Sequence, residues 1–332
     1  MRKVVLFGTN RGGVSPPADD RFIFTVKTDN AGTSASNQFT IPTSTGGITQ
    51  AFLYDIETSD GQTITGNTGN TTITFPTAGT YDVKISGSFP YMFFNNGGDK
   101  LKLLDIKNFG IYALGSTSQS GTFYGCSNMI ITATDSGIFG SVTNFIGTWR
   151  ECSSLTSFPL IDTSSATSFS STWNNCSSLI SFPLLDTSSV IFFSFSWSNC
   201  RNLTSFPLID TSSGTDFQRT WQDCRNLTSF PLLDTSSGTN FLESWRDCRN
   251  LTSFPANAFD TNIATNYTRA FQTTNLLTQS IDDILVSLDT SGVSNGTFTQ
   301  SGGQAPSATG EAAIDSLVGR GWTITVTGGY TP

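Results

Sequence analysis

Tryptophan and cysteine recur at a fixed spacing through the middle of this chain. Cysteines stand at positions 152, 176, 200, 224 and 248, each 24 residues after the last, and a tryptophan precedes every one of them by three residues. The two columns comprise Cys152, Cys176, Cys200, Cys224 and Cys248 with Trp149, Trp173, Trp197, Trp221 and Trp245. A fixed period of this length is typical of repeats that must stack to bury their apolar faces. The period therefore predicts stacked 24-residue coils with both columns in the core.

Within one coil, the apolar spacing predicts two kinds of local structure. Phe217, Trp221 and Cys224 are four and three residues apart, an interval that places them on one face of a helical or 3₁₀ turn. Leu-Thr-Ser-Phe at 227–230 predicts a short strand ended by proline, and Asp-Thr-Ser-Ser at 234–237 favours a turn. In the coil that begins at Cys200, the side chains expected in the core are Leu203, Phe206, Leu208, Ile209, Phe217, Trp221 and Cys224.

Less regular copies flank the array. Cys126 opens a 26-residue unit in which Phe123 takes the place of the tryptophan. At the other end, Phe271 and Thr274 occupy the tryptophan and cysteine positions. Degenerate outer copies are expected, because the ends of an open stack must be capped.

The repeated pattern C-x-x-L-x-x-F-P-x-x-D-T-S-S-x-x-x-F-x-x-x-W resembles the BspA-like leucine-rich repeats of bacterial surface proteins and of phage structural proteins. The resemblance covers roughly Cys126 to Thr274. It implies a right-handed solenoid with a parallel strand ladder on one side. The chain departs from the commoner repeats in carrying tryptophan where they carry phenylalanine, and in the proline that follows the strand.

The segments outside the repeats have other patterns. Residues 1–20 are basic and then rich in glycine and proline, as in an extended arm. Alternating apolar and polar residues over 21–94 predict a small β-sandwich. Residues 75–86, Phe-Pro-Thr-Ala-Gly-Thr-Tyr-Asp-Val-Lys-Ile-Ser, resemble the closing hairpin of PKD-like immunoglobulin-fold domains.

The predicted fold class is mainly β: an Ig-like sandwich, then a leucine-rich-repeat-like solenoid, then an α/β cap. The solenoid is expected over 95–274, with an N-terminal cap at 95–125 and repeats at 126–274. The C-terminal cap is expected over 275–332. There, Ser280 is a candidate cap for a helix, and either Ser307 or Thr309 is a candidate cap for a second one.

Composition excludes several function classes. Histidine is absent, which removes the commonest general base, proton shuttle and metal ligand. Net charge is −8, which argues against nucleic-acid binding. The apolar run near the N-terminus is too short for a signal peptide, and no segment approaches the ~20 apolar residues of a membrane helix. We therefore expect neither nucleic acid nor membrane as a partner, and no export signal.

The cysteine column allows three interpretations. Zinc binding needs thiols two to four residues apart, and disulfides need Cβ atoms that face one another, whereas stacked equivalents point the same way. Buried free thiols that pack as small apolar groups fit best. No metal site and no cofactor are predicted from them.

Two charged rows are candidate surface sites. Asp162, Asp186, Asp210 and Asp234, with Asp260 near the same place, either cap their own turns or form a calcium-binding edge. Arg201, Arg225 and Arg249 either neutralise acidic neighbours or contact an anionic glycan or a partner. Glycoside hydrolysis needs one pair of carboxylates at a cleft, so a periodic row argues against catalysis.

These observations predict a non-enzymatic structural protein of a tailed-phage virion, a tail fibre or adhesin, or a head decoration or fibre. It would be assembled in the host cytoplasm, because a surface-type repeat without an export signal fits release by lysis. Its N-terminal region is expected to anchor it to capsid or tail proteins, its solenoid to bind a host glycan or protein, and the chain to form a homo-oligomer. The alternative is a bacterial cell-surface adhesin with the same repeats. A polysaccharide-degrading enzyme is disfavoured.

Overall fold

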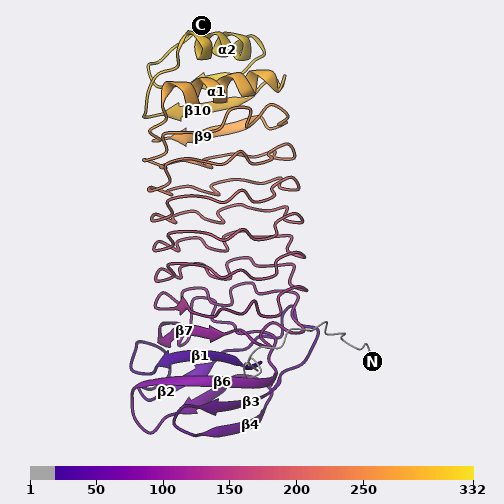
Figure 1. Cartoon of the computed structure of the whole chain (residues 1–332), viewed down its shortest axis with the longest axis vertical. Coiled ribbons are helices and arrows are strands. Elements are labelled where there is room, and N and C mark those ends of the chain that lie inside the picture. Colours follow the sequence, from indigo (N-terminus) through magenta and orange to yellow (C-terminus); the bar gives the residue numbers. More distant parts are fainter. Residues whose placement is uncertain (1–18) are drawn as a thin grey trace, which may run out of the picture.

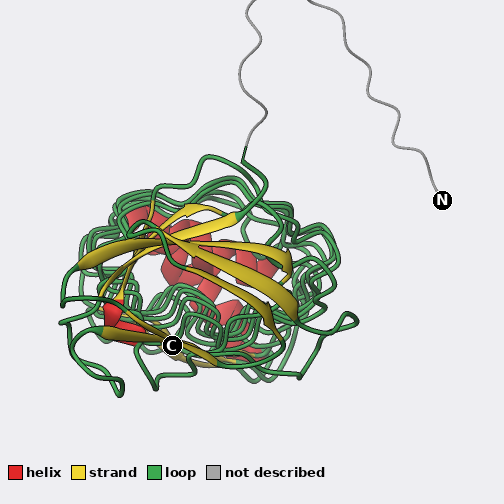
Figure 2. Ribbon diagram, turned by 90° about the horizontal axis from the view of Figure 1, so that it is seen from below, coloured by secondary structure: helices red, strands yellow, loops and turns green. Residues whose placement is uncertain are grey.

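A computed structural model describes residues 19–332, so the predicted arm at 1–20 lies almost wholly outside the described residues. The molecule is a column of stacked coils, with a β-sheet region at the N-terminal end and a helical cap at the other (Figure 1). Seen along the column, successive coils superimpose into one flattened outline (Figure 2). The fold is mainly β, as predicted, and the described residues contain two α-helices.

The N-terminal region consists of two sheets packed face to face around aromatic side chains. Its strands are β1 (Phe22–Lys27), β2 (Gln38–Ile41), β3 (Leu53–Thr58), β4 (Thr63–Asn67), β5 (Thr71–Thr74) and β6 (Thr80–Ser88). In the larger sheet these strands have the order β4-β3-β6-β1, and β2 pairs with β5 in the smaller one. Phe22, Phe24 and Val26 are fully buried, as their alternation predicts for a strand with one face in the core.

The larger sheet does not end at residue 94 but continues into the column. β7 (Leu103–Asn108) follows a 3₁₀ turn, η1 (Lys100–Lys102), and pairs with β1 on one side and with β8 (Ile130–Ile131) on the other. The pairing is antiparallel with β1 and parallel with β8. Because one strand belongs to both parts, hydrogen bonds run without a break from the N-terminal sheet into the first coils.

Equivalent residues of successive coils form a parallel row of bridges. The row runs through Ser118, Asn144, Ser168, Phe192, Asp216, Asn240 and Asn266. In the residues that follow each bridge, every second backbone N–H donates to a carbonyl of the next coil. Phe217 donates to the carbonyl of Asn240 at 2.9 Å, and Trp221 to that of Ser244 at 2.9 Å. Each coil is therefore bonded to its neighbour along most of this side.

The predicted helical turn and the predicted strand within each coil are both wrong. The intervening N–H groups close tight turns instead: Thr220 donates to the carbonyl of Phe217 at 3.2 Å and Cys224 to that of Trp221 at 3.2 Å. Two consecutive turns return the chain to the core at the same four- and three-residue intervals as a helix. Residues 227–230 form no continuous strand; this side holds one bridge, between Ser229 and Ser253.

These turns need a left-handed residue two positions before each tryptophan. The column of such residues is Gly121, Gly147, Ser171, Phe195, Arg219, Glu243 and Arg269, with φ between 53° and 68°. Glycine adopts this conformation without strain, whereas a residue with a Cβ atom is strained there. The first coils thus carry glycine where the backbone must be left-handed. The later coils carry other residues at this position, and their backbone is strained there.

Ser171→Gly is therefore expected to stabilise the protein, by about 0.5–1 kcal/mol, because the relieved strain exceeds the flexibility that glycine adds to the unfolded chain. Ser171 has φ of 57°, and no hydrogen bond of its side chain would be lost. The midpoint of urea unfolding measures the effect. Ser170→Gly is the control: its residue has no positive φ, its hydroxyl lies 3.1 Å from that of Ser194, and its midpoint should fall. A lower midpoint for Ser171→Gly would contradict the assignment of strain.

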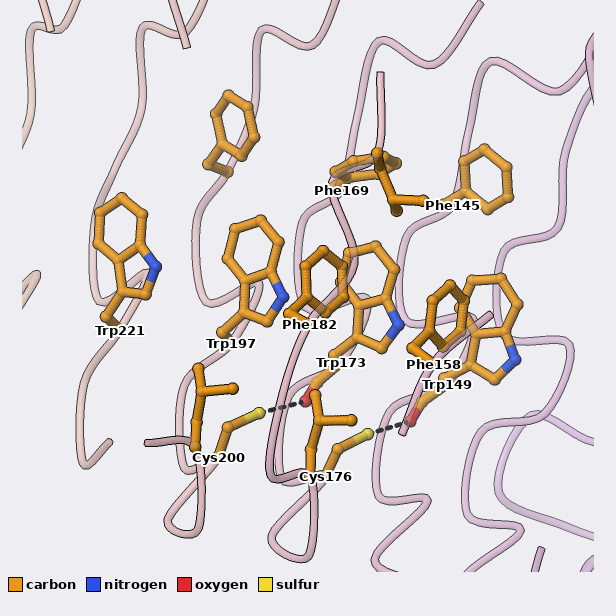
Figure 3. Close-up of a cluster of buried hydrophobic side chains, with 14 of the residues drawn as sticks. Phe145, Trp149, Phe158, Phe169, Trp173, Cys176, Phe182, Trp197, Cys200 and Trp221 are labelled. Carbon is orange, nitrogen blue, oxygen red and sulfur yellow. Dashed lines mark hydrogen bonds between the residues drawn. The ribbon is translucent and has the colours of Figure 1, made fainter. Parts of the chain in front are cut away.

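Aromatic side chains fill the core as three parallel columns, one of tryptophans and two of phenylalanines (Figure 3). Adjacent tryptophan rings stack at 5.3–6.2 Å between centroids, with planes within 10° of parallel. Phenylalanines from the Phe-Pro segment make T-shaped contacts with them, such as Phe206 with Trp197 at 4.8 Å. Phe123 and Phe271 continue the tryptophan column at its two ends. Neighbouring coils thus bury each other's rings.

The C-terminal cap closes the column with a three-stranded parallel sheet and two helices. Its elements are β9 (Asn266–Gln272), α1 (Thr278–Thr290), β10 (Thr297–Ser301), α2 (Ala308–Gly319) and β11 (Thr323–Thr325), with sheet order β11-β10-β9. The prediction of Ser307 as a helix cap is confirmed, since it accepts a bond from the N–H of Thr309. The prediction for Ser280 is wrong: α1 begins earlier, and the Ser280 hydroxyl accepts a bond from Phe254 of the last coil.

Candidate binding surface

The cysteine column lies inside the stack and links one coil to the next. All six cysteines are buried and free. Each thiol from Cys152 onward donates to a backbone carbonyl of the preceding coil, as from Cys176 to Trp149 at 3.1 Å and from Cys200 to Trp173 at 3.3 Å (Figure 3). Burial raises the pKa of these thiols. They are therefore protonated packing groups, poorly suited to act as nucleophiles or metal ligands.

A column of hydroxyls that the sequence analysis missed runs beside the tryptophans. Its members are Thr148, Thr172, Ser196, Thr220 and Ser244, each buried and each directly before a tryptophan. The Ser196 hydroxyl lies 2.8 Å from the carbonyl oxygens of both Phe169 and Phe193, and so bridges two coils. The signal was present in the sequence, because a serine or threonine fills this position in all five repeats.

The aspartate row caps turns on the surface. Asp210 accepts bonds from the N–H of Ser212 at 2.9 Å and from its hydroxyl at 2.7 Å, and Asp162, Asp186 and Asp234 repeat this geometry. The serine hydroxyl bonds hold the pKa of Asp162 and Asp210 below the usual value. Asp260 does not repeat this geometry and instead accepts a bond from the hydroxyl of Ser287 in α1. Residues 19–332 contain no cluster of three or more Asp, Glu, His or Cys side chains that could hold a metal ion.

The arginine row is paired with acidic neighbours. Arg201 and Arg225 both contact Asp223, at 2.8 and 2.6 Å, and Arg249 contacts Asp247 at 3.3 Å. The positive charge of this row is therefore largely compensated within the protein. The interpretation in which the row neutralises acidic neighbours describes these contacts best.

A second ionic cluster lies on the same side of the later coils. Only 3 % of the Glu243 side chain is exposed, and it contacts Arg219, Arg246 and Arg269 at 2.8, 3.1 and 3.4 Å. Burial raises the pKa of Glu243, but the hydrogen bonds from Arg219 and Arg246 outweigh it and the pKa is lowered. The carboxylate is thus fixed in its charged form by three guanidinium groups.

On the earlier coils, the same side is hollowed into a polar groove. Its volume is about 380 Å³, and it is lined by Arg150, Ser171, Asn174, Phe195, Ser198, Asn199 and Gln222. The hollow exists because Gly147 and Ser171 are small at the position where the next coils carry Phe195 and Arg219. The guanidinium of Arg219 lies 5.4 Å from the centre of the Phe195 ring and so adjoins the groove.

The amide groups of the polar groove are only weakly engaged within the protein. The Asn199 amide donates to the Ser198 hydroxyl at 3.1 Å, but the other contacts are longer: Asn174 donates to the carbonyl of Ser198 at 3.4 Å, and the Ser198 hydroxyl lies 3.5 Å from the Gln222 side-chain oxygen. Bonds of this length are weak, so donors and acceptors are left for a ligand. Neutral amides, hydroxyls and one aromatic ring match a ligand rich in hydroxyl groups better than an apolar one.

The structure also corrects the predicted core, because Leu208 and its equivalents point outward. Leu160, Leu184, Leu208 and Leu232, hereafter the leucine row, are 63, 62, 64 and 52 % exposed. Leu184, Leu208 and Leu232 are each the central residue of a three-residue turn, as shown for Leu208 by the bond from the Ile209 N–H to the Pro207 carbonyl at 3.0 Å. This turn places Leu208 at its apex and Ile209, 2 % exposed, in the core.

Comparison of the chain with protein-family models, with curated proteins and with solved structures gives no match. None of the helices among residues 19–332 has the length and apolar character that crossing a membrane requires.

Proposed function

We propose that this chain is a non-enzymatic structural protein of a tailed-phage virion, whose column binds the host surface. In this proposal the column is a right-handed solenoid of the BspA-like leucine-rich-repeat kind, and the N-terminal sheets form an Ig-like sandwich that anchors the chain to capsid or tail proteins. The observation that carries the proposal is the continuous column itself. It is bonded from β1 to β11 and carries a polar groove on its side.

The state of the reactive groups supports binding over catalysis. Each aspartate of the row is engaged in its own turn, Glu243 is held by three arginines, and the thiols are bonded to carbonyls inside the stack. A carboxylate pair for hydrolysis would need one member with a raised pKa that faces a cleft. The repeated polar groups instead join and cap coils.

A bacterial cell-surface adhesin is the second candidate, because the same column could display the polar groove from a cell. That function would require export by an unconventional route. The two candidates differ in where the protein is found, and they share the binding surface.

The test is immunogold electron microscopy of intact particles with antibody against the column. Label at the tail tip is expected for an adhesin, and label over the head for a decoration or head fibre. Particles without label would contradict the virion proposal and favour the bacterial surface. Where label lies on the tail, the purified chain should compete with adsorption. The Phe195→Ala/Gln222→Ala variant of the groove should compete less, and Leu53→Ser, an exposed position on β3 outside the groove, should compete as well as the parent chain.

A further inference from the structure

The leucine row is an apolar stripe on an otherwise polar surface. Its four side chains follow one another at intervals of one coil, and each leaves more than half of its surface to solvent. The neighbouring exposed positions of the coil are hydroxyl-bearing, as at Thr204 and Ser205, or acidic, as at Asp210. Ile180, 51 % exposed, widens the stripe on one coil. Contiguous exposed apolar surface of this kind marks an interaction site.

We propose that the leucine row is a self-association surface, at which a second copy of this chain packs side by side with the first, in parallel orientation. The row is flanked differently on its two sides, and this asymmetry carries the proposal. Along the coil, Thr204 and Ser205 precede Leu208, and Asp210 follows it.

The one-coil spacing of the leucines favours a second copy of this chain as the partner. Leucines spaced by one coil can interdigitate along their whole length only with apolar groups of the same spacing, and a second copy supplies that spacing. The three-residue turns place Leu184, Leu208 and Leu232 at an apex, and Leu160 is as exposed as they are, so all four side chains reach the solvent. A single contact would bury little, but four in register add up along the row.

The charges beside the row select the parallel orientation. A two-fold axis along the column places the aspartate row of one copy opposite the threonine and serine side of the other. The Thr204 hydroxyl already donates to the Ile180 carbonyl at 3.3 Å, so it is the Ser205 hydroxyl that can donate to a carboxylate of the second copy. A two-fold axis across the column would instead set aspartate opposite aspartate, where like charges repel. The parallel arrangement also brings both N-terminal regions to the same end.

The first measurement is sedimentation velocity of the full chain over a wide range of concentration. A monomer–dimer equilibrium is expected, and the Leu184→Ser/Leu208→Ser variant should weaken it by at least tenfold. Both side chains are exposed, so the fold should persist, which circular dichroism checks. Leu53→Ser is the matched control, since Leu53 is 61 % exposed on β3 and should leave the equilibrium unchanged. A chain that stays monomeric, a trimer, or a dimer that tolerates the double variant would overturn the proposal.

The second measurement tests orientation with a short thiol-to-thiol maleimide cross-linker. Because the six native cysteines are buried, a cysteine placed in the row offers the exposed thiol. In a parallel dimer, Leu160→Cys, Leu184→Cys, Leu208→Cys and Leu232→Cys should each cross-link to the same residue of the second copy. Cross-linking confined to the middle of the row would indicate antiparallel packing and overturn the proposed arrangement.

Discussion

Trp197→Ala is expected to lower the free energy of unfolding by about 3–5 kcal/mol, at the upper end for a core truncation. The ring of Trp197 stacks on Trp173 at 5.4 Å and on Trp221 at 6.2 Å, and it meets Phe206 in a T-shaped contact at 4.8 Å. Removing it opens a cavity between three coils whose positions are fixed by their own hydrogen bonds, so the cavity cannot collapse. Urea unfolding followed by far-ultraviolet circular dichroism measures the loss.

Trp197→Phe should cost much less, about 1–2 kcal/mol, for two reasons. Phe123 and Phe271 occupy the same column in the flanking coils and stack there on Trp149 and Trp245. In addition, the indole N–H of Trp197 has no hydrogen-bond partner among the described residues, so the substitution sacrifices no bond.

The exposed side chain of the same coil supplies the control for this series. Leu208→Ala should change the unfolding free energy by less than about 0.5 kcal/mol, because it removes surface that the solvent already reaches. If Trp197→Phe lowered the free energy of unfolding as much as Trp197→Ala does, the indole would have to make a specific contact beyond ring stacking. If Trp197→Ala were mild, the coils would have to stack without the aromatic column.

Much of the column could be predicted from the period alone, because apolar residues that recur at the same position of every coil are buried together when the coils stack. Trp197 and Cys200 are buried for this reason. The backbone between them could not be predicted in the same way, since two consecutive turns and one helical turn give the same apolar intervals. The glycines at 121 and 147 were the available sign of left-handed positions, but most coils carry other residues there.

The candidate surfaces were only partly predictable. The arginine row was visible, but its pairing with Asp223 and Asp247 depends on which residues the stacking brings together. The polar groove arises from a difference in side-chain size between adjacent coils, which a search for repeated residues overlooks. The sequence pattern places the leucine row in the core because Leu208 is followed by a second apolar residue, Ile209, and the pattern does not show which of the two the turn directs outward.

The junction between the N-terminal sheets and the column was also beyond the sequence patterns, and a buried ion pair holds it. Asp99 and Lys102 have side chains 0 and 1 % exposed. Asp99 accepts bonds from the backbone N–H groups of Thr33, Ser34 and Thr40 at 2.9, 3.0 and 2.7 Å. Lys102 donates to carbonyls of the same loop, those of Ala35 and Gln38 among them, at 2.8 and 2.9 Å. Two charges thus fasten the loop at 33–40 to the first turn of the column.

Asp99→Ala is therefore expected to destabilise this junction by about 3–5 kcal/mol, because it leaves Lys102 buried without a counter-charge and three N–H groups without an acceptor. Hydrogen exchange of the amides in β1, β2 and β7 measures the loss where it occurs. Asp29→Ala, which removes an exposed pair with Lys27, should leave these amides as protected as in the parent chain. Unchanged protection in Asp99→Ala would contradict the role of the pair.

The same carboxylate should make the junction sensitive to acid. Burial raises the pKa of Asp99, but the bonds from Ser34 and Thr40 and the charge of Lys102 outweigh it, so the pKa in the folded protein lies below the usual value. Its contribution to stability is therefore complete above the unfolded pKa, roughly 4, and is lost as the pH falls through the lower folded value. Asp99→Asn cannot titrate, so the difference in junction protection between it and the parent chain should shrink as the pH falls below about 4. A difference that stayed constant to lower pH would contradict the titration of Asp99 as its cause, and no difference at any pH would mean that the ion pair adds little to a junction already joined by β1 and β7.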